Sequence, residues 1–125
     1  MTMTDKAKQL ARKIATVADN KKGNQIVILN MQGLSFLTDY FVIVSASNKI
    51  LVKAIVDYVE DELGKEKIFA VHKEGYTEGN WVLLDFGDVV LHVFLEAERD
   101  FYNLEQLWAD APSEAFEVEE DVTKA

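Results

Sequence analysis

The sequence predicts one α/β domain with a mixed β-sheet covered by helices, its elements in the order α-β-β-α-β-β-β-α. Three observations lead to this class: apolar stripes with helical spacing, unbroken apolar runs typical of interior strands, and a length of 125 residues. A chain of that length fits a single domain, and we find neither an internal repeat nor a domain linker.

The first predicted helix spans residues 4–19, where Thr4 can cap the start. Residues 20–23 predict its end, because they supply two lysines and then Gly23. The apolar positions recur every three or four residues, as in a helix with one buried side: Ala7, Leu10, Ala11, Ile14 and Ala18.

Two unbroken apolar runs, at residues 26–29 and 40–44, predict interior strands because β-branched and aromatic residues dominate them. Residues 32–35 between them predict a turn or loop. A second helix is predicted over residues 48–63, with Ser47 or Asn48 as its cap and Gly64 as its stop. Its apolar stripe comprises Val52, Ile55, Val56, Val59 and Leu63.

A short strand is expected over residues 68–71, followed by a polar loop over residues 74–80. The strongest local signal comes next. Strands 81–86 and 89–95 flank Gly87-Asp88, a two-residue turn with glycine first, as a type II′ hairpin requires.

Pairing the residues on either side of this turn sorts the hairpin into two faces. One face is wholly apolar and is assigned to the core: Val82, Leu84, Phe86, Val89, Leu91 and Val93. The other, called the mixed face below, carries Trp81, Leu83, Asp85, Val90, His92 and Phe94. A face of that composition is either half covered by a helix or offered to a partner.

A third helix is predicted over residues 97–108, where Phe101, Leu104 and Trp108 recur at spacings of three and four. Pro112 ends the predicted domain, which therefore covers residues 1–112. Residues 113–125 hold five acidic residues and one lysine without an apolar stripe, and they predict a mobile acidic tail.

The net charge of −9 is unevenly distributed. Residues 1–25 carry six Lys or Arg and two Asp, whereas the rest of the chain carries seven basic and twenty acidic residues. An acidic body argues against extensive nucleic-acid contact and suits a basic protein partner. The alternative is that the acidic surface simply keeps the protein soluble.

Several classes of protein are excluded or disfavoured by composition and motifs. The chain has no cysteine, so it has neither disulfides nor a thiolate site. No run approaches the roughly 20 apolar residues of a membrane span, and no targeting signal is apparent, so a cytoplasmic location is expected. Phosphate-binding glycine loops and a nucleophilic serine elbow are also absent. His72 and His92 lack the neighbours of a metal or catalytic site, so we predict no catalytic residue, metal or cofactor.

Two acidic residues and a group of aromatics leave alternatives open. Asp85 and Asp88 flank the hairpin turn and could together hold a divalent cation, although Asp88 is explained more simply by turn geometry. Aromatic residues gather in the C-terminal third among acidic ones, which is typical of protein interfaces and also of a core. The aromatics are Trp81, Phe101, Tyr102 and Trp108.

Specific segments of the chain resemble one protein family. Residues 32–43 read QGLSFLTDYFVI, residues 81–94 read WVLLDFGDVVLHVF, and residues 99–108 read RDFYNLEQLW. With residues 52–55 and 74–75 they resemble the ribosomal silencing factor family, RsfS or Iojap. The resemblance runs from about Leu10 to Trp108 and leaves the acidic extension after Pro112 outside it.

The resemblance implies a small domain of nucleotidyltransferase-like shape without catalytic carboxylates. It also implies binding to large-subunit ribosomal protein fourteen, which blocks joining of the small subunit and represses translation under nutrient limitation. Little direct nucleic-acid contact is expected, and no membrane contact. The residues expected to bind the ribosomal protein are Trp81, Leu83, Asp85, Asp88, His92 and Tyr102.

Two other hypotheses remain at this point. The chain could be a nucleotidyltransferase that holds magnesium with Asp85 and Asp88, or the mixed face could close a homodimer when the protein is free. Nucleotide titration with Mg²⁺ tests the first hypothesis. Light scattering across a dilution series tests the second.

Overall fold

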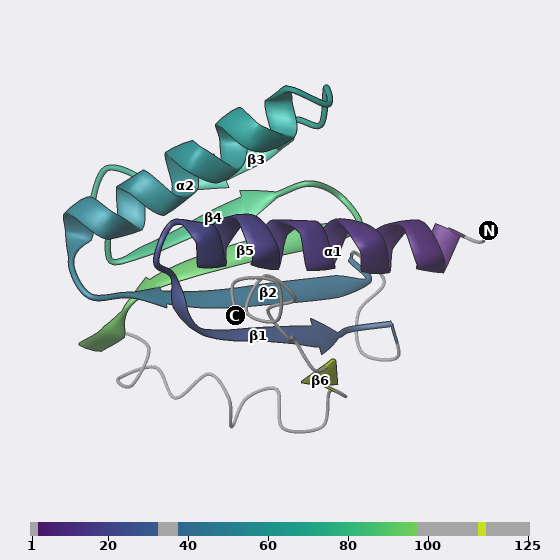
Figure 1. The fold of residues 1–125 in the computed structure, drawn as a ribbon, viewed down its shortest axis with the longest axis horizontal. Coiled ribbons are helices and arrows are strands. Elements are labelled where there is room, and N and C mark those ends of the chain that lie inside the picture. Colours follow the sequence, from purple (N-terminus) through teal and green to yellow (C-terminus); the bar gives the residue numbers. More distant parts are fainter. Residues whose placement is uncertain (1–2, 33–37, 98–112, 115–125) are drawn as a thin grey trace, which may run out of the picture.

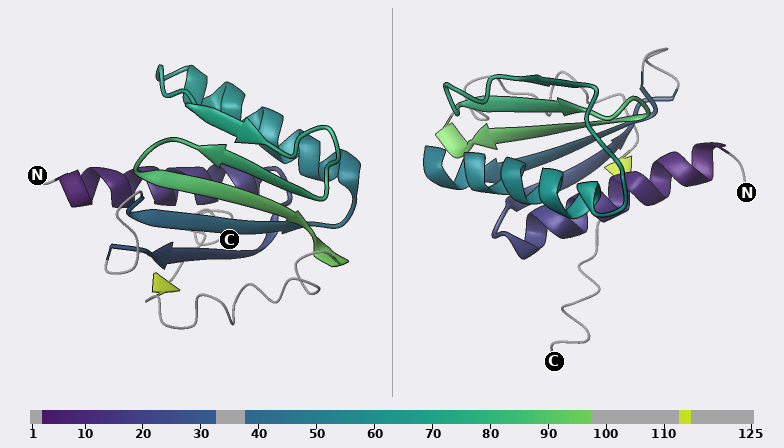
Figure 2. Two further views of the ribbon diagram at one scale, coloured as in Figure 1. Left: turned by 180° about the vertical axis from the view of Figure 1, so that it is seen from behind. Right: turned by 90° about the horizontal axis from the view of Figure 1, so that it is seen from above.

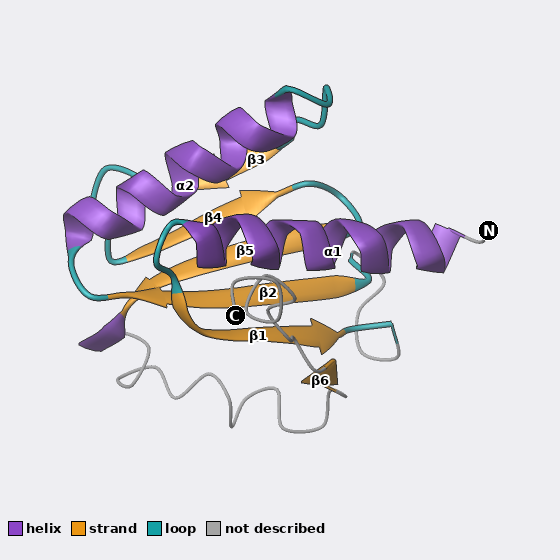
Figure 3. Cartoon of the chain, viewed as in Figure 1, coloured by secondary structure: helices purple, strands orange, loops and turns teal. Residues whose placement is uncertain are grey.

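The computed structural model of the chain describes residues 3–32, 38–97 and 113–114. Within these residues, two helices pack on one face of a single six-stranded sheet (Figures 1 and 3). This arrangement confirms the predicted α/β class with a mixed sheet. In chain order the elements are α1 (Met3–Asn20), β1 (Asn24–Asn30), β2 (Tyr40–Ala46), α2 (Lys49–Gly64), β3 (His72–Glu74), β4 (Trp81–Asp85), β5 (Val89–Leu95) and β6 (Ser113–Glu114).

The strands lie side by side in the order β3-β4-β5-β2-β1-β6. The central pair, β2 and β5, is parallel, and every other pair is antiparallel. Its register joins Val42 to Leu91 and Val44 to Val93. These four side chains are fully buried, so the parallel pair forms the floor on which both helices rest.

Helix α1 buries the stripe that the sequence predicts except for Leu10, which is half-buried. Ala7, Ala11, Ile14 and Ala18 are at most 1% exposed. Small side chains along this stripe allow the helix to lie close to β1 and β2, while the larger Ile14 fills the space between them.

Helix α2 begins at an Asn48 cap, whose side-chain oxygen accepts a hydrogen bond from the Leu51 N–H at 2.8 Å. Its predicted apolar stripe is buried throughout. The helix ends at Gly64, within one residue of the predicted end, and Lys65 is its C-terminal cap. The positive φ that follows the helix belongs to Lys67, at 63°, and not to the glycine.

The predicted hairpin register is confirmed: Val82 pairs with Val93, Leu84 with Leu91, and Asp85 with Val90. The turn has Gly87 at a φ of 94°, a backbone conformation that glycine adopts without strain. The face assigned to the core is fully buried except for Phe86, which is half-buried.

The third strand lies later in the chain than predicted. It covers His72–Glu74, whereas residues 68–71 precede the sheet and leave Phe69 67% exposed. The reason is tertiary, because pairing with β4 begins only where the Val71 N–H reaches the carbonyl of Asp85.

Two residues of the predicted acidic tail are part of the sheet. Ser113 and Glu114 pair with Leu29 and Ile28 as β6, which corrects the prediction of a mobile tail for these two positions. Residues 115–125 lie outside the described residues. The third predicted helix is assigned only at Glu96 and Ala97, and its remaining residues lie outside the described ranges. Neither of the two described helices is long and apolar enough to cross a membrane.

Candidate protein-interaction face

The mixed face lies on the side of the sheet opposite α1 and α2. Figure 2 (left) shows the strands from that side, with β4 and β5 in front of the helices. Register places Trp81 beside Phe94, Leu83 beside His92, and Asp85 beside Val90. Four of the six predicted contact residues are therefore brought together on this face: Trp81, Leu83, Asp85 and His92.

The centre of the mixed face is an aromatic cluster. The Trp81 and Phe94 ring centroids lie 4.8 Å apart, and Phe41 packs edge-on against His92 at 4.6 Å. Phe41 comes from β2, and sequence reasoning missed its place here. Phe41 reaches His92 only because β2 pairs with β5 in parallel, and the alternation of residues within one strand does not reveal which strands pair.

A hydrogen bond joins the two polar members of this cluster. The indole Nε1–H of Trp81 donates to Nδ1 of His92 at 3.1 Å. His92 is 4% exposed, and burial lowers its pKa from 6.5 to about 4. A protonated imidazole could not accept this hydrogen bond at Nδ1, so the neutral ring and the orientation of Trp81 support each other.

Exposure differs between the centre and the rim. His92, Val90 and Phe94 are buried, while Trp81, Leu83 and Asp85 are half-buried. His92, one of the six residues expected to contact the partner, therefore offers little surface of its own. It acts on this face chiefly by holding Trp81.

The hairpin turn has a different basis from the predicted one. Asp85, and not Asp88, shapes the turn with its carboxylate, because Oδ1 of Asp85 accepts from the Gly87 N–H at 2.7 Å. Asp88 contributes its backbone carbonyl, which accepts from the N–H groups of Asp39 and Tyr40 and from the hydroxyl of Thr38. The turn is thus tied to the start of β2, and the exposed Asp88 side chain lies at the end of the face.

The alternative metal site rests on Asp85 and Asp88 alone. No group of three or more His, Asp or Glu residues suited to a metal ion occurs in the described part of the chain. Tyr102, the sixth predicted contact residue, lies outside the described residues.

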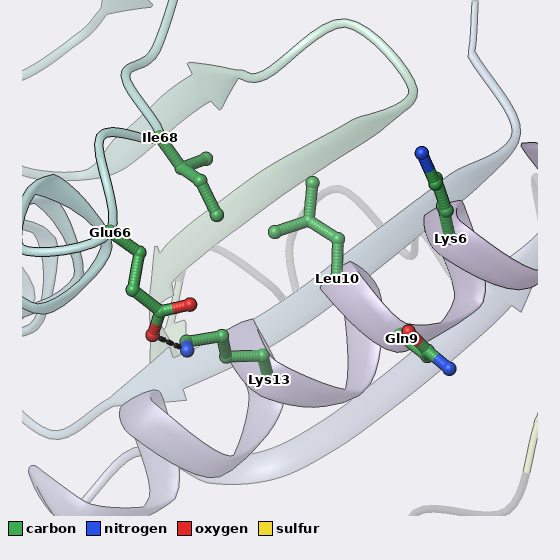
Figure 4. Close-up of a pocket in the computed structure, with 6 residues that line it drawn as sticks. All are labelled: Lys6, Gln9, Leu10, Lys13, Glu66 and Ile68. Atoms are coloured by element: carbon green, nitrogen blue, oxygen red, sulfur yellow. Dashed lines mark ion pairs between the residues drawn. The ribbon is translucent and has the colours of Figure 1, made fainter.

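Hollows open on both sides of the sheet in the described part of the chain. One, of about 260 Å³, lies at the edge of the mixed face and is lined by Glu74, Gly75, Trp81 and Leu83. The other lies on the helix side, between α1 and the segment that follows α2, where an ion pair between Lys13 and Glu66 spans it (Figure 4). That ion pair fastens the segment to α1, so we assign the second groove a structural role.

The fold and sequence match known proteins. A family model described as "Ribosomal silencing factor during starvation" matches residues 4–125. The chain is 41% identical over 105 residues to ribosomal silencing factor RsfS of Bacillus subtilis, covering 84% of this chain and 89% of that protein. It is 37% identical over 101 residues to the chloroplastic protein Iojap of Arabidopsis thaliana, covering 81% of this chain and 42% of that protein.

A crystal structure from Bacillus halodurans has the same fold, with a TM-score of 0.77 and 38% sequence identity. The match covers 86% of this chain and 98% of that one. Sequence and fold therefore agree along most of the chain, and the protein belongs to the ribosomal silencing factor (RsfS) family.

Proposed function

We propose that this protein associates with the large ribosomal subunit and regulates translation, and that it binds ribosomal protein fourteen through the mixed face. Bound there, it blocks joining of the small subunit by its bulk and lowers translation when nutrients are scarce. The observation that carries the proposal is membership of a family whose model is described as a ribosomal silencing factor during starvation.

The mixed face supports this role through its composition. Trp81 and Leu83 are half-buried apolar side chains beside the carboxylate of Asp85 and the exposed Asp88. Interfaces draw most of their binding energy from a few aromatic anchors, and charged residues around them guide docking. An overall charge of −9 favours approach to a basic protein.

A steric block requires no chemistry, and we expect no catalytic residue in this protein. The rival nucleotidyltransferase hypothesis, with Mg²⁺ held by Asp85 and Asp88, is tested by nucleotide titration. The expected cytoplasmic location and the homodimer of the free protein remain predictions. The contact expected of Tyr102 also remains a prediction.

Cosedimentation with purified large subunits tests the proposal directly. We expect Trp81→Ala to weaken binding by at least about 2 kcal/mol, as loss of an aromatic anchor does. The matched control is Ile50→Ala, which removes a side chain that is 83% exposed at the start of α2, and it should bind as the parent does.

Circular dichroism must show that Trp81→Ala keeps the fold of the parent, so that any loss of binding can be attributed to the missing side chain. A folded Trp81→Ala variant that binds as tightly as the parent would remove the mixed face from the proposal. A parent protein that does not cosediment, or that leaves subunit joining unimpaired, would overturn the proposed function itself.

A further inference from the structure

The hollow at the edge of the mixed face has mostly carbon walls. It is formed where β3 meets β4, and its lining residues are Glu74, Gly75, Trp81 and Leu83. The polar atom of the Trp81 ring is engaged by His92, so the indole presents carbon to the hollow. Gly75 and the side chain of Leu83 complete the apolar lining.

Gly75 is required for the hollow to exist in this form. It has a φ of 81°, and a Cβ at this position would lie 2.0 Å from the backbone carbonyl oxygen of Trp81. The close approach of these two backbone segments brings the carboxylate of Glu74 and the ring of Trp81 to the same small space.

The rim of the hollow is acidic. Glu74 pairs with Leu83 in the ladder and therefore lies on the same side of the sheet as Trp81 and Asp85. Its side chain is 67% exposed, and within the described residues its one side-chain partner is His72. Oε2 of Glu74 contacts Nε2 of His72, so Oε1 is the oxygen that this exposed carboxylate offers to a donor beside an apolar space of about 260 Å³.

We propose that this hollow receives an arginine side chain of a basic protein partner. The apolar walls suit the aliphatic part of the side chain, and the Trp81 ring suits a guanidinium plane stacked on it. The carboxylate of Glu74 suits the paired N–H groups at the tip, which a lysine ammonium lacks. This assignment rests on the proposed function and names the kind of side chain that the mixed face recognises.

Arginine recognition can be measured without the ribosome. The probe is Nα-acetyl-arginine amide, with Nα-acetyl-citrulline amide as a neutral probe of the same shape and Nα-acetyl-lysine amide as a cation without the planar fork. We follow the Trp81 indole N–H resonance, which Trp81→Phe identifies. We expect saturable shifts with the arginine probe, and affinity at least about 5-fold weaker for the other two.

Variants locate the site. Glu74→Gln should abolish the preference for arginine over citrulline. The matched control is Glu78→Gln, which removes the same charge from an exposed carboxylate of the neighbouring loop that does not line the hollow, and it should keep the preference. Equal shifts with arginine and citrulline, or an unchanged preference in Glu74→Gln, would overturn the assignment.

Binding to purified large subunits separates this inference from the proposed function. We expect Glu74→Gln to weaken binding about 10-fold at low salt and to flatten its salt dependence, while Glu78→Gln stays within about 2-fold of the parent. If Trp81→Ala loses binding and Glu74→Gln does not, the arginine site is wrong and the proposed function stands. If the parent binds the arginine probe but not the large subunit, the proposed function fails and the arginine site stands.

Discussion

The two faces of the β4–β5 hairpin are built from alternating residues of the same two strands, yet they differ in composition and in the interactions that stabilise them. The face under α1 and α2 holds Val82, Leu84, Val89, Leu91 and Val93, all fully buried and all apolar. The mixed face holds the hydrogen-bonded pair of Trp81 and His92 and the carboxylate of Asp85. The first face needs only volume and packing, whereas the second also needs each buried polar atom to have its partner.

The comparison teaches where stability and recognition reside. Apolar packing under the helices contributes stability in proportion to the area it buries. The polar groups of the mixed face add little net stability but fix the orientation of Trp81. Three predictions test this division, from the largest expected effect to the smallest.

Adjacent leucines of β4 provide the most direct test. Leu84 is fully buried under the helices, and Leu83 is half-buried on the mixed face. We expect Leu84→Ala to lower the free energy of unfolding by about 3 kcal/mol, because it leaves a cavity, and Leu83→Ala by about 1 kcal/mol. Urea unfolding of both variants measures the difference, and equal losses would show that the two faces are packed alike.

Acid should lower the stability of the fold in part through His92 on the mixed face. The pKa of His92 is lowered to about 4 in the fold, against 6.5 in an unfolded chain, so the unfolded chain binds a proton between these values and the fold does not. Stability therefore falls as the pH falls through this window, and we expect His92 to account for about 2 kcal/mol of the loss between pH 7 and pH 4.5.

Urea unfolding of His92→Gln at both pH values isolates this contribution from that of the carboxylates. The variant should lose less stability than the parent over the same pH range. An identical loss in both proteins would mean that His92 is not the group that titrates.

The smallest expected effect concerns the hydrogen bond between Trp81 and His92. Trp81→Phe keeps an aromatic ring and removes the donor, so we expect a loss of about 1 kcal/mol in the free energy of unfolding at pH 7. In a His92→Leu background the same substitution should cost less, because the acceptor is already gone. A cost that is equal in both backgrounds would assign the effect to ring packing alone.

Strand alternation and the glycine turn were sufficient to predict the hairpin register and both of its faces. They did not predict the role of Asp85 in the turn, because Asp85 and Asp88 both suit a turn and only the folded backbone decides which carboxylate meets the Gly87 N–H. Thr38 was also missed, since its hydroxyl bonds the carbonyl of Asp88, fifty residues along the chain. For Tyr102 the prediction stands untested.

The end of α1 also shows a feature that the local sequence does not predict. Gly23 was predicted to end α1 by its backbone freedom, yet Lys22 takes the positive φ of 70°. Gly23 is small for a tertiary reason, because a Cβ there would lie 2.5 Å from Cγ1 of Val44. The composition of a helix end predicts that the helix stops, but the packing of the neighbouring strand decides which residue turns.

By itself the sequence determined the α/β class, the apolar stripes and the two hairpin faces, because these depend on residue period and on turns of a few residues. The tertiary structure alone decided the parallel pairing of β2 with β5, the place of Phe41 beside His92, and the hollow between Glu74 and Trp81. Each of these joins segments that are not neighbours along the chain or needs the folded backbone of a loop. Local patterns carry no information on such pairings, since they are selected by the packing of the whole sheet.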